Sequence, residues 1–177
     1  MKTKVFLIIV LTILIGACPV QADTVWLTGH HEIFDGDLYG EIYIYNDVTL
    51  DILGGDIYKL ETYDLTLTDW YAGEMDRLYN YDDSTVNIFG GTLYTLEATE
   101  NSLVYLYAYD VTYDPTGGGY GNGWIEGIYY NDDSTFGFSL FSQDTYSHIN
   151  VIPEPSTILL LSLGVLLIRK RRKSKSR

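Results

Sequence analysis

Cysteine is almost absent from this chain, which has 177 residues and a single thiol, Cys18. That thiol lies in an N-terminal segment that we expect to be removed, so the remaining chain is predicted to form no disulfide and to offer no thiol nucleophile. The Gly-x-Ser-x-Gly element of serine hydrolases and a glycine-rich phosphate loop are also missing from the sequence. These absences exclude a disulfide scaffold and several common kinds of active site.

Basic side chains are scarce in the central region, residues 23–152, where Lys59 and Arg77 are the only strong bases. Nearly all of the 24 acidic residues fall in the same region, so it is more negative than the formal net charge of −13 for the whole chain indicates. Such a surface repels nucleic acid and anionic membranes. We expect its partners to be cations, neutral glycans or other proteins, and we expect no cofactor.

The N-terminal segment has the pattern of a secretory signal peptide. Lys2 and Lys4 precede an apolar stretch over residues 5–17, and small residues follow up to Ala22. We expect signal peptidase to cleave after Ala22, which assigns residues 1–22 to the signal peptide. The alternative is that the Ile-Gly-Ala sequence before Cys18, which is similar to a lipobox, directs lipidation of Cys18.

The C-terminal segment combines three features in order. Pro153, Glu154 and Pro155 come first, an apolar run of 11 residues (158–168) follows, and a basic cluster (169–177) closes the chain. A full membrane span needs about 20 apolar residues, so this run covers about half of a hydrocarbon core. Positive charge this dense is expected to stay cytoplasmic, which leaves the rest of the chain outside. The alternative is an apolar helix whose basic tail only improves solubility.

This tail resembles the PEP-CTERM sorting signal of bacterial exosortase substrates. The resemblance spans about residues 152–177, and we assign residues 153–177 to the signal. It implies export, transient anchoring in the inner membrane through a short C-terminal helix, and processing by an exosortase near Pro153, Glu154 and Pro155. The processed protein is then expected at the cell surface or outside the cell.

An internal repeat organises the central region. Residues 43–61 and 79–97 align without gaps at an offset of 36 and share tyrosine, aspartate, threonine and paired glycine positions. Units this short cannot bury an apolar face alone and must stack on their neighbours. Turn-type residues recur at about half that offset, and each precedes a short segment of alternating apolar residues: Asp47, Asp64, Asp83 and Asn101.

We therefore predict an all-β protein, a short β-solenoid with about 18 residues per coil, flanked by the signal peptide and the C-terminal apolar helix. Residues 23–112 form the coils, with Gly54-Gly55 and Gly90-Gly91 at corners, and residues 113–152 form a glycine-rich loop and a C-terminal β cap. The repeat resembles Asp-Ser-Thr-Val-x-Ile-x-Gly-Gly solenoid units of some PEP-CTERM proteins, and residues 83–91 are the nearest copy. An antiparallel β-sandwich is the alternative fold.

No pattern in the sequence predicts a metal site. His30 and His31, which lie near Glu32 and Asp35, are adjacent on an expected strand and would point to opposite faces. Aspartate pairs such as Asp82-Asp83 lack the spacing of a calcium-binding loop, so we expect them to form turns.

No pattern predicts a catalytic site either, and we expect the protein not to be an enzyme. Carboxylate pairs that could hydrolyse glycosides, such as Asp51 with Glu61 or Asp69 with Glu74, arise by chance in so acidic a chain. A polysaccharide lyase needs cationic side chains near the uronate, and this region offers only the two strong bases, which lie one predicted coil apart.

Tyrosine is the remaining feature, because all 17 tyrosines fall in the central region and recur about once per coil. A ladder of stacked rings that stabilises one face is the structural interpretation. The functional interpretation is a surface that stacks on sugar rings, with Tyr79, Tyr81, Tyr105 and Tyr107 as candidates. The predicted function is therefore a structural or adhesive protein of the cell surface or extracellular matrix, associated with polysaccharide or with other matrix proteins. A carbohydrate-binding module and a small glycan-active enzyme are the alternatives.

Overall fold

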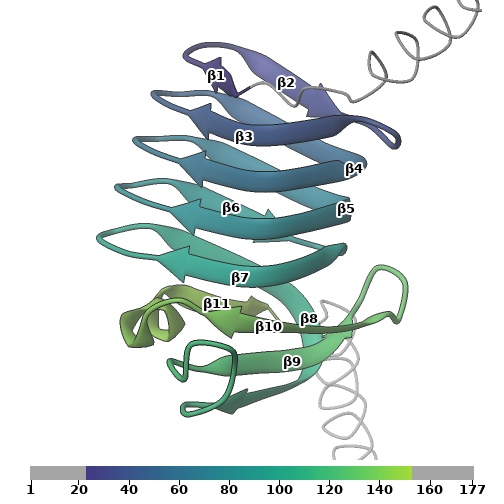
Figure 1. Cartoon of the computed structure of the whole chain (residues 1–177), viewed down its shortest axis with the longest axis vertical. Coiled ribbons are helices and arrows are strands. Elements are labelled where there is room, and N and C mark those ends of the chain that lie inside the picture. Colours follow the sequence, from purple (N-terminus) through teal and green to yellow (C-terminus); the bar gives the residue numbers. More distant parts are fainter. Residues whose placement is uncertain (1–22, 153–177) are drawn as a thin grey trace, which may run out of the picture.

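The computed structural model describes residues 23–152, which fold into a stack of β-strand coils closed at its C-terminal end by further strands (Figure 1). The stack contains β1 (Thr24–Trp26), β2 (His30–Ile33), β3 (Leu38–Ile44), β4 (Thr49–Thr62), β5 (Leu67–Asn80), β6 (Thr85–Ile88), β7 (Thr92–Ala98) and β8 (Leu103–Asp114). The C-terminal part adds β9 (Trp124–Tyr129), β10 (Thr135–Leu140), the 3-10 helix η1 (Gln143–His148) and β11 (Ile149–Ile152).

Parallel pairing at a constant offset builds the stack. Thr49 pairs with Leu67, Leu67 with Thr85, and Thr85 with Leu103, so successive coils have an offset of 18 in the sequence. The prediction of a β-solenoid with coils of this length is confirmed, and the described residues make about five turns. The alternative of an antiparallel β-sandwich is wrong, because the repeated strands pair in parallel.

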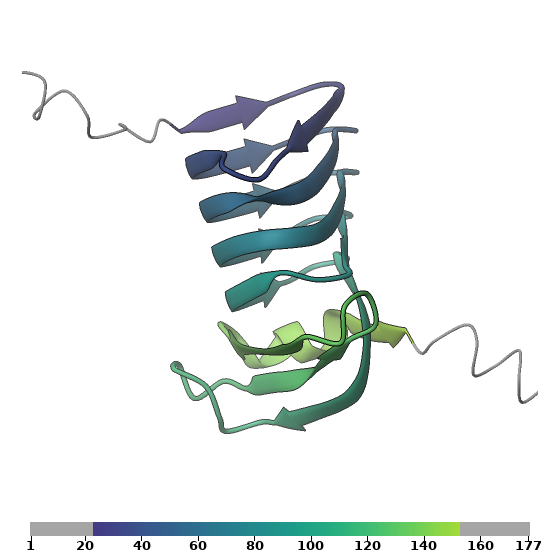
Figure 2. The same cartoon turned by 90° about the vertical axis from the view of Figure 1, so that its right-hand side faces the viewer.

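Each coil contributes one strand to each of two sheets (Figure 2). The first sheet contains β2, the first half of β4, the first half of β5, β6, β8 and β11. The second sheet contains β1, β3, the second halves of β4 and β5, β7 and β10. β4 and β5 belong to both sheets because each bends at a glycine corner, where the pairing register shifts.

The core lies between the two sheets and follows from strand alternation. Leu50 and Ile52 on the first sheet are buried, as are Val86 and Ile88 two coils later, whereas Asp51 and Asn87 between them point outward. Burying an aliphatic side chain of this size contributes about 1.5–3 kcal/mol each. The alternation that the sequence shows is thus the source of the fold's stability.

Acidic and amide side chains close the turns between the two sheets. Asn46, Asp64, Asp82 and Glu100 occupy equivalent positions and have φ values of 55–63°, the left-handed conformation that asparagine and aspartate tolerate best. The carboxylate of each coil accepts a hydrogen bond from the backbone N–H one coil earlier: Asp64 from Asn46 at 2.9 Å, Asp82 from Asp64 at 3.2 Å, and Glu100 from Asp82 at 3.0 Å. The turn-forming role predicted for Asp64 and Asp82 is confirmed, and the other predicted turn residues, Asp47, Asp83 and Asn101, lie in the same turns. Asn46 and Glu100 are turn positions that the sequence did not single out.

The segment after the repeats covers the C-terminal end of the stack, as the sequence predicts. β9 and β10 form an antiparallel hairpin, β10 pairs in parallel with β7, and β9 pairs with the far part of β8. β11 pairs in parallel with β8 and so extends the first sheet by one strand. The glycine-rich segment, residues 115–123, contains no strand. Within residues 23–152, no helix is long and apolar enough to span a membrane.

The predicted signal peptide with Ala22 and Cys18, and the sorting signal with its short helix, lie outside the described residues. The structure of these two segments therefore remains a prediction from sequence.

Candidate functional site

The four tyrosines proposed for glycan stacking lie on two different sheets. Tyr79 is the last residue but one of β5, in the second sheet, and Tyr81 follows in the adjoining turn. Tyr105 and Tyr107 lie on β8, where they pair with Asn150 and Ile152 of β11 in the first sheet. All four side chains are half-buried. The structure thus brings them together as two pairs, and not as one surface.

Two columns of stacked aromatic rings run along the solenoid axis. In the turn column, ring centroids are 4.7 Å apart between Tyr45 and Tyr63 and 5.2 Å apart between Tyr63 and Tyr81. In the corner column, they are 4.7 Å apart between Tyr71 and Phe89 and 4.2 Å apart between Phe89 and Tyr107. The middle ring of each column has both faces covered by its neighbours, which favours the stabilising role.

Burial and neighbouring carboxylates raise the pKa values of tyrosines in the turn column. The Tyr63 hydroxyl donates a hydrogen bond to Glu61. Burial, and then this hydrogen bond, raises the pKa of Tyr63 well above its ordinary value. Burial and the nearby carboxylate of Glu97 likewise raise the pKa of Tyr81. Both phenols stay neutral at physiological pH, so the column adds no charge to an already acidic surface.

One lysine lies between two carboxylates on the second sheet. The Lys59 ammonium contacts Glu41 of the preceding coil and Glu61 of its own coil, the latter at 3.1 Å, and it donates a hydrogen bond to the Tyr43 hydroxyl at 2.9 Å. Its side chain is only 15% exposed. Burial lowers the pKa of Lys59, but the hydrogen bonds to Glu41, Tyr43 and Glu61 outweigh it and raise this pKa overall. Lys59 is therefore a structural cation that ties two coils together.

We expect Lys59→Met to lower the free energy of unfolding by about 2 kcal/mol, because it leaves Glu41 and Glu61 facing each other without a cation. Arg77→Met is the matched control: Arg77 pairs with Lys59 in register, and its guanidinium lies over the Tyr58 ring at 5.2 Å. The control should cost less than about 1 kcal/mol. Urea denaturation followed by circular dichroism measures both losses of unfolding free energy. Equal losses would contradict the role of Lys59 as the cation that ties two coils together.

The same contact has a pH dependence with a defined sign. The hydrogen bond from Lys59 holds the pKa of Glu41 below its ordinary value. A carboxyl group whose pKa is lowered by folding stabilises the fold above its unfolded pKa, and this contribution is lost as the pH falls through the folded pKa. The contact is thus fully formed at neutral pH and weakens in acid.

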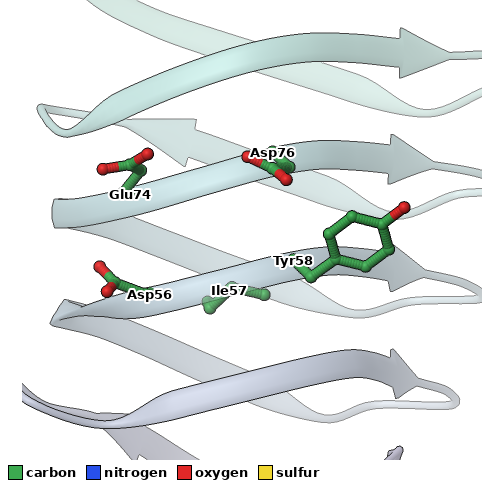
Figure 3. Close-up of a pocket in the computed structure, with 5 residues that line it drawn as sticks. All are labelled: Asp56, Ile57, Tyr58, Glu74 and Asp76. Atoms are coloured by element: carbon green, nitrogen blue, oxygen red, sulfur yellow. The ribbon is translucent and has the colours of Figure 1, made fainter. Parts of the chain in front are cut away.

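Beside this lysine, the second sheet carries a shallow acidic pocket of about 230 Å³. Figure 3 shows Asp56 and Tyr58 on one coil and Glu74 and Asp76 on the next, with Asp56 and Glu74 directly one above the other. The residues lining the pocket include no histidine, cysteine, lysine or arginine. The pocket can attract a cation or a polar ligand, and the ionisable groups in its lining are three carboxylates and one phenol.

The structure separates the carboxylate pairs that the sequence suggested for glycoside hydrolysis. Asp51 lies on the first sheet and Glu61 on the second, and Asp69 and Glu74 are divided in the same way by the corner of β5. Lys59 and Arg77 lie one coil apart, as expected from their spacing. Glu41 and Lys59 are also one coil apart in the sequence, and this spacing places them in register on neighbouring strands. The contact between them could have been predicted from that spacing but was not.

The two adjacent histidines diverge as predicted. The His31 ring stacks on Trp26 with centroids 4.3 Å apart. His30 points outward, where its Nε2 atom lies near the carboxylates of Glu32 and Asp51. Asp35 lies in the corner after β2 and is not part of this group. The sequence suggested Asp35 as a neighbour of His30, whereas in the structure Asp51 of the next coil lies beside His30.

Comparison with protein-family models identifies the C-terminal segment. Residues 151–173 match the PEP-CTERM protein-sorting motif, so the chain carries the sorting signal of an exosortase substrate. The motif implies an exported protein that is held transiently at the membrane by its C-terminus and has an exosortase as processing partner. Searches of curated proteins and of solved structures each found no match to the chain.

Proposed function

We propose that the protein is a non-catalytic component of the cell surface or extracellular matrix, delivered by the exosortase route and retained by adhesion. The observation that carries this proposal is the order of elements at the C-terminus. β11 ends at Ile152, and Pro153, Glu154 and Pro155 of the sorting motif follow at once. Processing near these residues would release the solenoid and its cap intact.

The properties of the body support a structural role. Parallel stacking on two sheets, aromatic columns and carboxylate-capped turns give a regular stack of coils whose outer faces carry carboxylates and tyrosines. Such faces suit contacts with neutral polysaccharide or with other matrix proteins, and they disfavour contacts with nucleic acid or anionic membrane. The shallow pocket in Figure 3 is lined by carboxylates and one phenol, without an imidazole, thiol or amine.

Cell fractionation tests the proposal. The protein should be found in the extracellular polymer layer and should be released when that layer is solubilised, and the purified protein should turn over no polysaccharide in a panel. The matched control is the same strain without a functional exosortase, in which the full-length chain should stay in the membrane fraction. Recovery from the cytoplasm, or polysaccharide turnover that a single carboxylate substitution abolishes, would contradict the proposal.

A further inference from the structure

Three potential metal ligands meet on the outer face of the first sheet, at its N-terminal end. His30 and Glu32 lie two residues apart on β2, so both side chains point to the same face. Asp51 on β4 is the register partner of Glu32. β2 and β4 are neighbours at the start of the stack in Figure 1. Strand alternation and parallel pairing together thus place one imidazole and two carboxylates side by side.

The distances between the donor atoms suit a small dication. His30 Nε2 lies 3.6 Å from Glu32 Oε1 and 3.7 Å from Asp51 Oδ2, and one donor atom from each residue lies within 4.8 Å of the others. Tetrahedral zinc, with bonds of about 2.0–2.2 Å, needs neighbouring donors about 3.3–3.5 Å apart. The two distances from His30 lie within a few tenths of an ångström of that spacing.

The ring of His30 is already oriented for metal binding. Its other nitrogen, Nδ1, lies 2.9 Å from the Thr49 hydroxyl, which can accept a hydrogen bond from an N–H there. In that tautomer the lone pair of Nε2 faces the two carboxylates. A partner on the second ring nitrogen is the usual arrangement around metal-bound histidine, because it fixes both the tautomer and the ring orientation.

The chemistry of the donors selects the metal. Calcium and magnesium prefer all-oxygen sites, and these three residues include no thiolate for soft metals, whereas one imidazole with carboxylates suits zinc. Two carboxylates balance the charge of a dication. The side chains of His30, Glu32 and Asp51 are 52%, 46% and 33% exposed, so a cation can enter from solvent and keep a water in its fourth position.

We propose that His30, Glu32 and Asp51 form a Zn²⁺ site with one open coordination position. The sequence alone predicted no metal site here. The bound ion would join the first coil to the second at the N-terminal end of the described stack. It would also offer a Lewis-acidic position on the outer face of the stack for a carboxylate or hydroxyl of a partner molecule. The proposal is independent of the sorting route.

Zinc titration of the full chain in detergent tests the proposal, with Cys18→Ser as the background so that no thiol contributes. A chromophoric chelator competes for the metal, and circular dichroism without zinc checks that each variant keeps its β spectrum. One Zn²⁺ should bind per chain, and His30→Ala and Asp51→Asn should each abolish this binding. Thr49→Val should weaken affinity about tenfold by freeing Nδ1. His31→Gln, which alters the neighbouring histidine, should leave zinc affinity unchanged.

Several results would show that the three residues do not form a zinc site. No zinc binding by the parent chain, unchanged affinity in folded His30→Ala, or binding of Ca²⁺ in preference to Zn²⁺ would each overturn the proposal. If His30→Ala does not fold, the same comparison is made with Glu32→Gln and Asp51→Asn. Retention of zinc by both of these folded variants would overturn it as well.

Discussion

Gly73→Ala should strongly destabilise the solenoid. A Cβ atom at this position would lie 2.6 Å from the carbonyl oxygen of Gly55 and 2.8 Å from the carbonyl carbon and oxygen of Gly54. These are backbone atoms in the corner of the preceding coil, and they cannot move away without breaking the pairing of β4 with β5. The residue also has φ of +102°, which disfavours any L side chain.

Both effects act together, so we expect a loss of more than about 4 kcal/mol, a large part of the 5–15 kcal/mol typical of a domain. Gly36→Ala is the matched control: its φ of +88° carries the same conformational penalty, but no heavy atom lies within 4 Å of the added Cβ. It should cost only about 1–2 kcal/mol. Urea denaturation of both variants measures the difference, and equal losses would contradict the close stacking of the corners.

Glu154→Ala should block maturation and leave the full-length chain in the membrane fraction. Glu154 is the acidic residue between Pro153 and Pro155 in the matched sorting motif. Replacing it removes a charge from the segment that the exosortase is expected to recognise, whereas the solenoid ends before it and should fold normally. We expect at least about a tenfold rise in the unprocessed fraction, which corresponds to about 1.4 kcal/mol of recognition.

Thr157→Ala is the control for this variant, because it changes a residue of the same segment outside the Pro-Glu-Pro element. Immunoblots of membrane and extracellular fractions separate the two forms by size. Normal processing of Glu154→Ala, at the rate of the parent chain, would show that the motif does not act as predicted here.

The repetitive parts of this fold could be predicted from sequence because each coil obeys the same rules. The offset of 36 between the two copies is two coils, and the turn-type residues gave the coil length as about half of it. Gly55 and Gly91 have positive φ values, as predicted for corners. In the coil between the two copies, by contrast, Leu65 and Leu67 of the short apolar segment are exposed, and Trp70 and Met75 fill the core instead, so the sequence pattern did not predict the buried residues of that coil.

The irregular first coil explains why the cluster around His30 could not be predicted. Glu32 pairs with Asp51 at an offset of 19, whereas Leu38 pairs with Asp56 at an offset of 18, because the first corner contains one more residue. An offset of 18 would have paired Glu32 with the inward-facing Leu50. A slip of one residue exchanges the two faces of a strand, so only the three-dimensional register shows that the side chains meet.

Intact mass spectrometry of the protein recovered outside producing cells tests the central claim, that an exosortase delivers this solenoid as an intact body. We predict a chain that begins at Asp23 and ends near Pro153, and therefore contains every described strand. A recovered chain that still ends at Arg177, from cells with an active exosortase, would contradict that claim.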